Sequence, residues 1–257
     1  MTTRYHVNNG VATLEMARPE KRNALTQEMY AGLADGLESA ADDEVVRAVI
    51  ITGQPGIFTA GNELADFVNP LPAGVEFPAR RFMKMLAQAD KPVIAAVTGP
   101  AVGIGVTMLL HCDLVYVAAG ATLSMPFVSL GLVPEFASSL LLPQRLGHVR
   151  AAEKLLLGEP MTADEAVHLG LANAVLPADQ LLPHARAEAE RFNGLPPDGV
   201  RASKRLIKHA QARLVEETIA RELEVFGSRL GSAEVREAVS AFFEKRAPDF
   251  AGVRGSG

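Results

Sequence analysis

Cysteine is scarce in this sequence of 257 residues, and its scarcity excludes a disulfide-stabilised fold. The single cysteine, Cys112, cannot form an internal disulfide bond. It lies in an apolar run, so we interpret it as a small buried side chain and not as a nucleophile.

Positive charge is not in excess either. The 25 Lys and Arg residues stand against 30 Asp and Glu residues, which gives a formal net charge of −5. Binding to a phosphate backbone calls for a basic surface, so this balance argues against nucleic acid as the main partner. The apolar fraction of 48% is sufficient for the buried core of a globular protein.

Common nucleotide-binding loops and targeting signals are also missing. Residues 103–108, GIGVTM, lack the third glycine of the GxGxxG motif, and no GxxxxGK[S/T] motif occurs. Residues 1–10 contain no apolar signal region, and residues 253–257 match no receptor-read address. A cytoplasmic location is therefore expected.

An uncharged run of nineteen residues spans 92–110 and has the length of a membrane span. Gly99 and Pro100 interrupt it near its middle, and His111 and Asp113 follow it closely. No second span flanked by Lys or Arg occurs elsewhere. We therefore expect no membrane partner.

Within this run, a short strand turns sharply into a helix. Residues 93–97 are apolar and rich in β-branched side chains, and residues 106–111 have the pattern of a buried helix. The glycines that break the strand are Gly99, Gly103 and Gly105. Main-chain N–H groups at such a turn lack an intrahelical partner and suit an oxygen that gains negative charge. The pattern predicts an oxyanion hole, with a purely structural turn as the alternative.

A second strand, expected over residues 45–52, shares its pattern with residues 93–97. The segments DEVVRAVIITG and DKPVIAAVTG align, and their threonines, Thr52 and Thr98, lie 46 residues apart. We interpret the two segments as successive turns of a repeated spiral of strands and helices. Equivalent loops on stacked turns lie side by side, so two amides distant in sequence can point at one oxygen.

Turn residues and apolar spacing predict the remaining elements. Asn9-Gly10 is typical of a two-residue hairpin turn between strands at residues 5–7 and 11–16. Thr162 and Glu165 form a capping box that opens a short helix. Helices are expected over residues 27–41, 79–89, 148–157 and 178–192, and strands over 113–118, 122–125 and 174–176. The Pro- and Gly-rich residues 69–78 either shape a substrate pocket or serve as a connector.

Glu135 is the only charged residue between Asp113 and Arg145. It follows Pro134, so its carboxylate is either exposed at a turn or held in an apolar setting that raises its pKa. The second alternative makes Glu135 a candidate general base beside the predicted oxyanion hole.

Residues 196–257 form a helical, charged region beyond a core of residues 1–195, with the segment GLPPDG between them. Large apolar residues recur at helical spacing in this tail: Leu206, Leu214, Ile219, Leu223, Phe226, Val235, Val239, Phe242 and Phe243. The tail is too small for an independent core, so we expect it to pack on the core, on other subunits, or on both. Its basic residues are interpreted as a solvated helix face, with contact to a ligand phosphate as the alternative: Arg201, Lys204, Arg205, Lys208 and Arg213.

Three motifs carry a resemblance to a known family: FTAGNEL at residues 58–64, PAVGIGVT at 100–107 and PFVSLGLVPEFASS at 126–139. The chain resembles the crotonase (enoyl-CoA hydratase/isomerase) superfamily, and within it the peroxisomal-type Δ3,Δ2-enoyl-CoA isomerase branch. The resemblance implies an α/β fold, a crotonase-like spiral of ββα repeats with a C-terminal helical oligomerisation region. It also implies a homotrimer or homohexamer that acts on an acyl-CoA thioester. No metal and no further cofactor are implied, because coenzyme A is part of the substrate.

The same resemblance assigns roles to single residues. It implies that the N–H groups of Ala60 and Ile104 bind the thioester oxygen and that Glu135 is the catalytic base. Two preorganised donors suit the enolate that forms when a proton leaves the carbon next to a thioester. Substrate contacts are implied for residues of three loops: Lys21, Arg22, Ala24, Gly61, Asn62, Glu63, Leu64 and Gly103. Of these, we expect Glu63 to have a structural part.

Two departures from the hydratase pattern favour isomerisation. Thr107 and Phe127 replace the two glutamates of the hydratases, which leaves Glu135 as the one carboxylate. A single base can carry a proton from C2 to C4 of a 3-enoyl-CoA, whereas adding water needs a second proton source. A hydratase or another crotonase-type reaction is one alternative, and a CoA-binding module without turnover is another. Phe136 stands where relatives carry a small residue, and we expect it to shorten the acyl pocket or to redirect Glu135.

Overall fold

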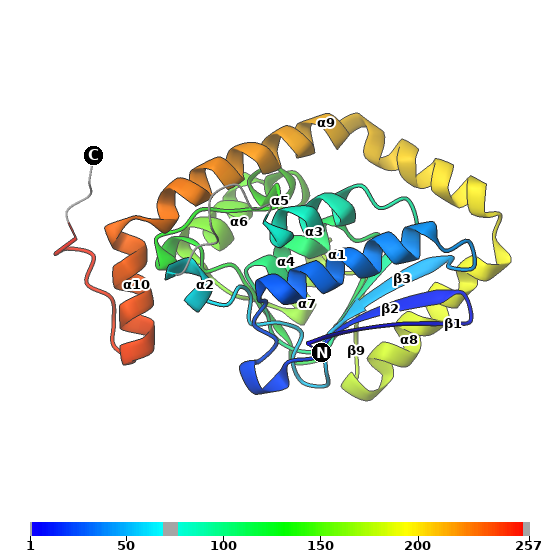
Figure 1. Cartoon of the computed structure of the whole chain (residues 1–257), viewed down its shortest axis with the longest axis horizontal. Coiled ribbons are helices and arrows are strands. Elements are labelled where there is room, and N and C mark those ends of the chain that lie inside the picture. Colours follow the sequence, from blue (N-terminus) through cyan, green and yellow to red (C-terminus); the bar gives the residue numbers. More distant parts are fainter. Residues whose placement is uncertain (1, 69–76, 254–257) are drawn as a thin grey trace.

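A six-stranded sheet forms the centre of the structure, a computed structural model that describes residues 2–68 and 77–253 (Figure 1). Its strand order is β1-β2-β3-β4-β6-β9, with the bounds Thr3–Asn8, Val11–Met16, Ala48–Thr52, Val93–Val97, Leu114–Ala118 and Ala174–Leu176. A smaller sheet consists of β5 (Ala101–Val102), β7 (Thr122–Ser124) and β8 (Met161–Thr162). Of the predicted loop at 69–78, all but the last two residues lie outside the described part of the chain.

The predicted hairpin and spiral are both present. β1 and β2 pair antiparallel around Asn9 and Gly10, whose φ angles of 47° and 71° are those that the turn requires. β3 and β4 are parallel neighbours, as successive turns of a spiral should be. Thr52 pairs with Ala96 and not with Thr98, so the register differs by two residues from the alignment of the two motifs. The strand expected from residue 45 begins at Ala48.

Alternate residues of a strand point to opposite sides of its sheet, and both sides of the large sheet are apolar. Helices therefore cover both of its faces. Val49 and Ile51 of β3 belong to the main apolar cluster, which also contains the buried face of α1 (Gln27–Asp42). Ala48 and Ile50 belong to a second cluster beneath α8 (Ala178–Glu190). α3 (Pro78–Ala87) packs against α1 and closes the first side.

The other elements among residues 2–68 and 77–196 are short. They are η1 (Pro19–Lys21), α2 (Ala65–Val68), α4 (Ile104–Thr107), η2 (Met108–His111), η3 (Val128–Leu130), α5 (Ser138–Leu146), α6 (His148–Ala152), η4 (Glu153–Leu157), α7 (Ala163–His168) and η5 (Arg191–Gly194). The predicted helix 148–157 is therefore split, because its second half is a π-helical turn. The capping box is confirmed, since the Thr162 hydroxyl accepts from the Glu165 N–H at 3.1 Å. Among the described residues, no helix has the length and apolar character needed to cross a membrane.

In residues 196–253 the C-terminal region consists mainly of two helices, α9 (Pro197–Leu230) and α10 (Ala233–Glu244), and α9 arches over the core in Figure 1. Packing on the core is confirmed, because Val235 and Val239 of α10 join the main apolar cluster and Phe226 of α9 packs against it. Other apolar residues of the tail stay exposed in the single chain: Leu206, Leu214, Phe242 and Phe243.

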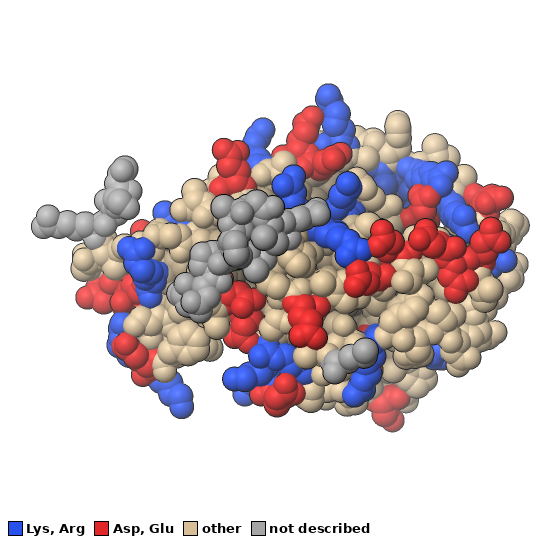
Figure 2. Space-filling view, in the orientation of Figure 1, with Lys and Arg blue, Asp and Glu red and all other residues tan. Residues whose placement is uncertain are grey.

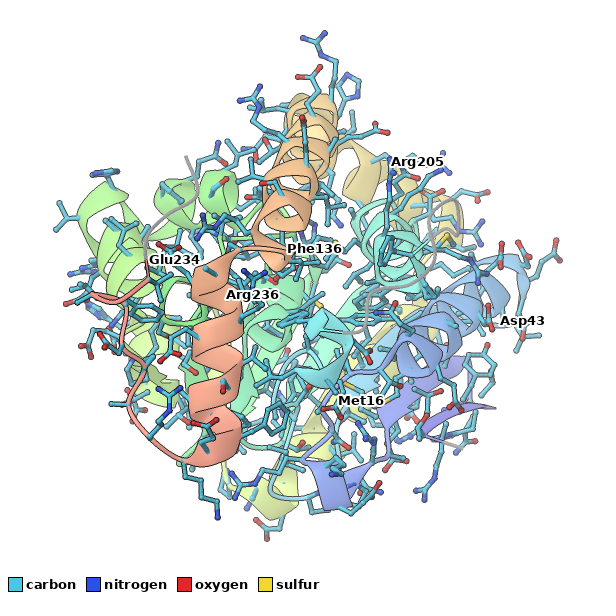
Figure 3. The ribbon with its side chains drawn as sticks, turned by 60° about the vertical axis from the view of Figure 1, so that its left-hand side comes forward. Met16, Asp43, Phe136, Arg205, Glu234 and Arg236 are labelled. Carbon is cyan, nitrogen blue, oxygen red and sulfur yellow. The ribbon has the colours of Figure 1, made fainter. Side chains whose placement is uncertain are left out.

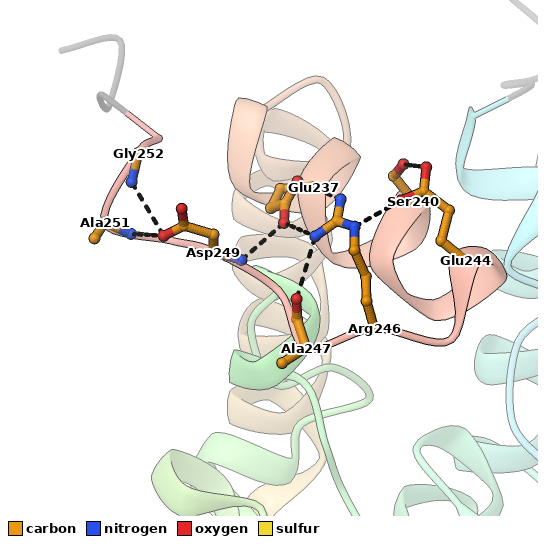
Figure 4. Close-up of polar contacts among 8 residues, drawn as sticks. All are labelled: Glu237, Ser240, Glu244, Arg246, Ala247, Asp249, Ala251 and Gly252. Atoms are coloured by element: carbon orange, nitrogen blue, oxygen red, sulfur yellow. Dashed lines mark hydrogen bonds and ion pairs between the residues drawn. The ribbon is translucent and has the colours of Figure 1, made fainter.

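The segment after α10 folds back along this helix (Figure 4). The Arg246 guanidinium donates to both carboxylate oxygens of Glu237, at 2.5 and 3.0 Å, and to Glu244 at 2.6 Å. The Asp249 N–H also donates to Glu237, at 2.7 Å. These contacts hold the end of the described chain against α10.

The interpretation of the tail's basic residues as a solvated face is wrong for two of them. Lys204 is 6% exposed, and its ammonium donates to the Lys91 carbonyl and to Asp113, both at 2.6 Å. Lys208 donates to the His111 carbonyl at 3.0 Å, and burial lowers its pKa to about 8. Both lysines thus fasten α9 to the core. Elsewhere, on the face shown in Figure 2, basic and acidic side chains lie next to one another.

Candidate active site

Two loops meet above the carboxyl ends of β3 and β4, as the repeat predicts. The N–H groups of Phe58 and Thr59 donate to the Pro100 carbonyl at 3.2 and 3.1 Å, and the Val102 N–H donates to Thr59 at 3.0 Å. Gly61 has a φ of 87°, and a Cβ there would lie 2.9 Å from the Val102 carbonyl oxygen. Only glycine fits a left-handed residue so close to another backbone. The FTAGNEL and PAVGIGVT loops therefore touch.

The Ile104 amide is one free donor at this junction. Ile104 is buried and is the first residue of α4, after Gly103, whose φ is 56°. An N–H in the first turn of a helix has no intrahelical acceptor. Within the described part of the chain, no hydrogen-bond partner of this amide is found. The geometry therefore fits the role that the sequence assigns to Ile104.

Ala60 does not fit the second donor, and this prediction needs correction. Its N–H donates to the Arg22 carbonyl at 2.9 Å, so it is already engaged. The next free amide is that of Asn62. Asn62 forms a parallel β-bridge with Leu25. The two hydrogen bonds of this bridge use the neighbours of Asn62: the Leu25 N–H donates to the Gly61 carbonyl, and the Glu63 N–H donates to the Leu25 carbonyl. The Asn62 N–H points the other way and has no partner among residues 2–68 and 77–253.

Hydrogen bonds from the side chains of Tyr30 and Arg18 hold the FTAGNEL loop in place. The Tyr30 hydroxyl of α1 donates to the Asn62 side-chain oxygen. Burial raises the pKa of Tyr30 well above its usual value, so the phenol stays protonated and remains a donor. Arg18 donates to Glu63 at 2.7 Å and to the Ala24 carbonyl at 3.0 Å. The Glu63 carboxylate is thus engaged in an ion pair, as a structural part would require.

Lys21 and Arg22 are exposed on the loop that precedes α1. Arg22 has a left-handed φ of 51°, and its carbonyl is the acceptor for Ala60. The Ala24 carbonyl is the acceptor for Arg18. This loop is therefore tied to the FTAGNEL loop, and two exposed cationic side chains extend from it.

Glu135 is buried and not exposed at a turn, which decides between the two alternatives. It is 1% exposed, and its Oε1 accepts a hydrogen bond from the Thr107 hydroxyl at 2.5 Å. Its Oε2 is buried without a partner among the described residues. Burial raises the pKa of Glu135 to about 8, against the hydrogen bond from Thr107, which lowers it. A carboxyl poised near neutral pH with one free oxygen can accept and return a proton.

The backbone after Glu135 takes a rare conformation. Phe136 and Ala137 have φ angles of 59° and 57°, the left-handed region that non-glycine residues avoid at a cost of about 1–2 kcal/mol each. Phe136, labelled in Figure 3, is fully buried. Its ring stacks on that of His111, with 3.9 Å between the ring centroids, and meets that of Phe82 edge-on, with 6.2 Å between the centroids. Burial lowers the pKa of His111 to about 3, so the neutral ring donates from Nε2 to the Phe136 carbonyl at 2.8 Å. The Phe136 side chain is thus accommodated by packing against the rings of His111 and Phe82.

Sequence reasoning missed one residue of this region, Glu222 of α9. Its carboxylate accepts from the N–H groups of Ala137 and Ser139 at 2.5 and 2.9 Å and from the Ser139 hydroxyl at 2.5 Å. The available signal was its spacing, since Glu222 lies three residues after Ile219 and four before Phe226, on the apolar face of the helix.

The two residues at the hydratase glutamate positions lie in the same region. Thr107 contacts Glu135, and Cε1 of the Phe127 ring lies 3.8 Å from the place that a Cβ of Gly103 would occupy. The segments that the resemblance singled out therefore converge on one place. Leu64 is half-buried on the FTAGNEL loop. No group of three or more His, Cys, Asp or Glu side chains suited to a metal ion occurs among the described residues.

A model of the enoyl-CoA hydratase/isomerase family matches residues 6–253. The chain belongs to this family. The crystal structure of an enoyl-CoA hydratase/isomerase from Pseudoalteromonas atlantica T6c is 44% identical and superposes with a TM-score of 0.94, covering 97% of this chain and 100% of that one. The crotonase fold predicted from the motifs is therefore confirmed.

Two characterised relatives in the enoyl-CoA hydratase/isomerase family carry isomerase names. The 1,2-epoxyphenylacetyl-CoA isomerase of Escherichia coli (strain K12) is 36% identical, over 96% of this chain and 97% of its own length. Human enoyl-CoA delta isomerase 2 is 34% identical over 93% of this chain, which spans 62% of the human protein. As a family member, this chain is an enzyme of the hydratase/isomerase class, and the family implies an acyl-CoA substrate.

Proposed function

We propose that this enzyme is an enoyl-CoA isomerase that shifts the double bond of a 3-enoyl-CoA to the 2-trans position. The observation that carries the proposal is Glu135, a buried carboxylate with one free oxygen, while Thr107 and Phe127 occupy the places of the hydratase glutamates. The name of one relative, human enoyl-CoA delta isomerase 2, supports the same assignment.

In the proposed mechanism, the ionised Glu135 removes a proton from C2 of the substrate. The electron pair of the broken C–H bond moves toward the thioester and forms a dienolate. Negative charge on the thioester oxygen is stabilised by the free N–H groups of Asn62 and Ile104, which act as preorganised donors. Glu135 then returns the proton to C4, which leaves the double bond between C2 and C3. The Thr107 hydroxyl occupies Oε1, so Oε2 is the oxygen that carries the proton.

The loop of Lys21, Arg22 and Ala24 is proposed to meet the nucleotide part of coenzyme A. Both cationic side chains are exposed, and their loop is bonded to the FTAGNEL loop through the Arg22 carbonyl. Exposed cations held beside the reacting centre suit the phosphates of this ligand. The reaction needs no further cofactor.

A homotrimer or homohexamer is the proposed assembly. Leu206, Phe242 and Phe243 of the tail are 77%, 61% and 58% exposed in the single chain. A cleft of about 1380 Å³ also separates α9 from α3 and η2. Burial of these side chains between subunits would remove apolar area from water. The cytoplasmic location stays a prediction.

A panel of 2-enoyl-CoA and 3-enoyl-CoA substrates, assayed for isomerisation and for hydration, tests the proposal. We expect conversion of 3-enoyl-CoA to 2-trans-enoyl-CoA, lost in Glu135→Gln. Hydration of 2-enoyl-CoA without isomerisation would contradict the proposal and favour a hydratase. CoA-ester binding without turnover of either substrate would favour a binding module.

A further inference from the structure

Glu222 is a buried carboxylate that the proposed chemistry does not use. It is 7% exposed and lies on the face of α9 that packs on the core. A charged group is costly to bury unless hydrogen bonds satisfy it. Glu222 meets this requirement with three donors, all from the turn that follows Glu135.

The three hydrogen bonds hold a turn that is unfavourable in itself. Ala137 has a φ of 57° and precedes α5, so its N–H and that of Ser139 would lack acceptors in the first helical turn. Glu222 supplies these acceptors from a distant helix. The Ser138 N–H meanwhile donates to the Glu135 carbonyl at 3.1 Å, so the position of the turn fixes the backbone of the proposed base.

The side chain of Glu135 has few contacts of its own. Thr107 is its one hydrogen-bond partner among the described residues, and its Oε2 has none. Its direction therefore depends on the backbone that carries it. That backbone is held from one side by His111, through the Phe136 carbonyl, and from the other by Glu222.

We propose that Glu222 is a positioning residue, whose carboxylate holds the turn 136–139 and thereby aims Glu135 at the substrate. The inference rests on the proposed function only in taking Glu135 as the base. If Glu222 has this role, α9 does more than pack on the core, because the C-terminal region then helps to build the active site.

The charge of Glu222 can be followed through the pKa of Glu135, which a purely structural role of Glu222 would not change. Among the residues that the structure describes, three titratable groups face Glu135 or its turn: Tyr30 from α1, His111 from η2 and Glu222 from α9. Burial keeps Tyr30 and His111 neutral. Burial also raises the pKa of Glu222, against the hydrogen bonds from Ser139 and Ala137, which lower it, so the negative charge near Glu135 is that of Glu222 in its ionised form. This charge adds to burial in raising the pKa of Glu135. Removing it should therefore lower that pKa.

The test compares Glu222→Gln, Glu222→Asp and a matched control, Glu224→Gln, an exposed glutamate on the same helix. A substitution that displaces a catalytic base typically lowers the reaction rate by up to about 100-fold. We therefore expect kcat of Glu222→Gln to fall about 10- to 100-fold with KM nearly unchanged. Glu222→Asp keeps the charge but is one methylene short, so kcat should fall without a shift in the pH profile. Glu224→Gln should behave as the wild type.

A rescue variant separates positioning from loss of fold. Ala137→Gly removes the steric cost of the left-handed φ, so in the Glu222→Gln background it should recover part of the lost kcat. Wild-type kcat in both Glu222 variants would overturn the proposal. So would a loss that matches the loss of folded protein and that Ala137→Gly does not recover.

Titration of Glu135 by ¹³C NMR needs no substrate and keeps this test apart from the proposed function. The Glu135 resonance is assigned by its absence in Glu135→Gln. We expect its titration midpoint to move to lower pH in Glu222→Gln and to stay in Glu222→Asp. If the wild type proves to hydrate instead of isomerise, the same kcat comparisons are made on hydration. An unmoved midpoint in Glu222→Gln, with unchanged kcat, would show that Glu222 does not act on Glu135.

Discussion

The Thr107 hydroxyl lies 2.5 Å from Oε1 of Glu135 and donates a hydrogen bond to it. Thr107 comes three residues after Ile104, so one helical turn carries both a proposed oxyanion donor and the partner of the proposed base. At the position of Thr107, where the hydratases carry a glutamate, this chain has a hydroxyl that orients the Glu135 carboxylate. Together with Phe127 at the other hydratase glutamate position, this difference is the physical basis for expecting isomerisation and not hydration.

Glu135→Gln tests the base directly. Glutamine keeps the size of the side chain and can accept from Thr107, but it cannot take the proton. Isomerisation should therefore fall by about 10² to 10⁴, the usual contribution of a general acid–base group. Steady-state rates on a 3-enoyl-CoA measure the loss, and CoA-ester affinity, which should barely change, reports on folding.

Glu63→Gln is the matched control for this experiment. Glu63 lies on the oxyanion loop, but its carboxylate is paired with Arg18 at 2.7 Å. We expect most of the activity to remain if the variant folds. Full activity in Glu135→Gln together with a large loss in Glu63→Gln would reverse the assignment.

The pH dependence of the wild-type rate follows from the pKa of Glu135. Burial raises this pKa to about 8, and the reaction begins with the ionised form. The value of kcat should therefore rise with pH, about tenfold per unit well below pH 8, and level off above it. A pH–rate profile measures this limb. A plateau that already begins near pH 5 would contradict a buried base.

Ile104→Pro removes one proposed oxyanion donor, and some added loss from backbone distortion is expected. Ile104 is the first residue of α4, and proline is well tolerated at this position because its missing N–H has no intrahelical acceptor. Losing one such donor typically costs about 10² to 10³ in rate. Thermal unfolding checks the fold. An undiminished kcat in a folded variant would remove Ile104 from the mechanism.

The motifs were sufficient to predict the fold and the meeting of the two loops, because glycine-rich turns and strand patterns are local signals. They were not sufficient to predict which amide is free. Ala60 and Asn62 lie two residues apart, and their difference depends on Arg22 and Leu25, which accept or donate from another loop. Hydrogen-bond partners across loops leave no trace in the spacing of a motif.

Buried charges in the tail escaped prediction for a related reason. The spacing of Glu222 places it on the apolar face of α9, but the sequence does not show which groups its carboxylate or the ammonium groups of Lys204 and Lys208 contact. Their burial is decided by partners from the core: Asp113, the His111 carbonyl and the N–H groups after Glu135. Only the three-dimensional fold brings these partners to α9.

Sedimentation tests the proposed assembly. The exposed apolar residues of α9 and α10 predict a trimer or a hexamer at micromolar concentration, with part of the tail buried between subunits. Phe243→Glu, which places a charge on one of these exposed positions, should shift the distribution toward smaller species. A wild-type monomer at micromolar concentration would exclude the assembly.

Thr107→Val tests whether the contact between Thr107 and Glu135 tunes the base. Valine has the shape of threonine but lacks the hydroxyl that lowers the pKa of Glu135. A hydrogen bond to a charged group contributes about 1.5–3 kcal/mol, so its loss should raise the pKa by about one unit or more and lower the rate at neutral pH about tenfold. Because the ionised form is recovered at high pH, the rate of Thr107→Val should approach that of the wild type only at pH values well above the raised pKa. Thr107→Ser keeps the hydroxyl and should keep the wild-type profile. An equal loss in both variants at every pH would mean that Thr107 acts through packing, and the pH–rate profiles of the three proteins, measured side by side, distinguish the two results.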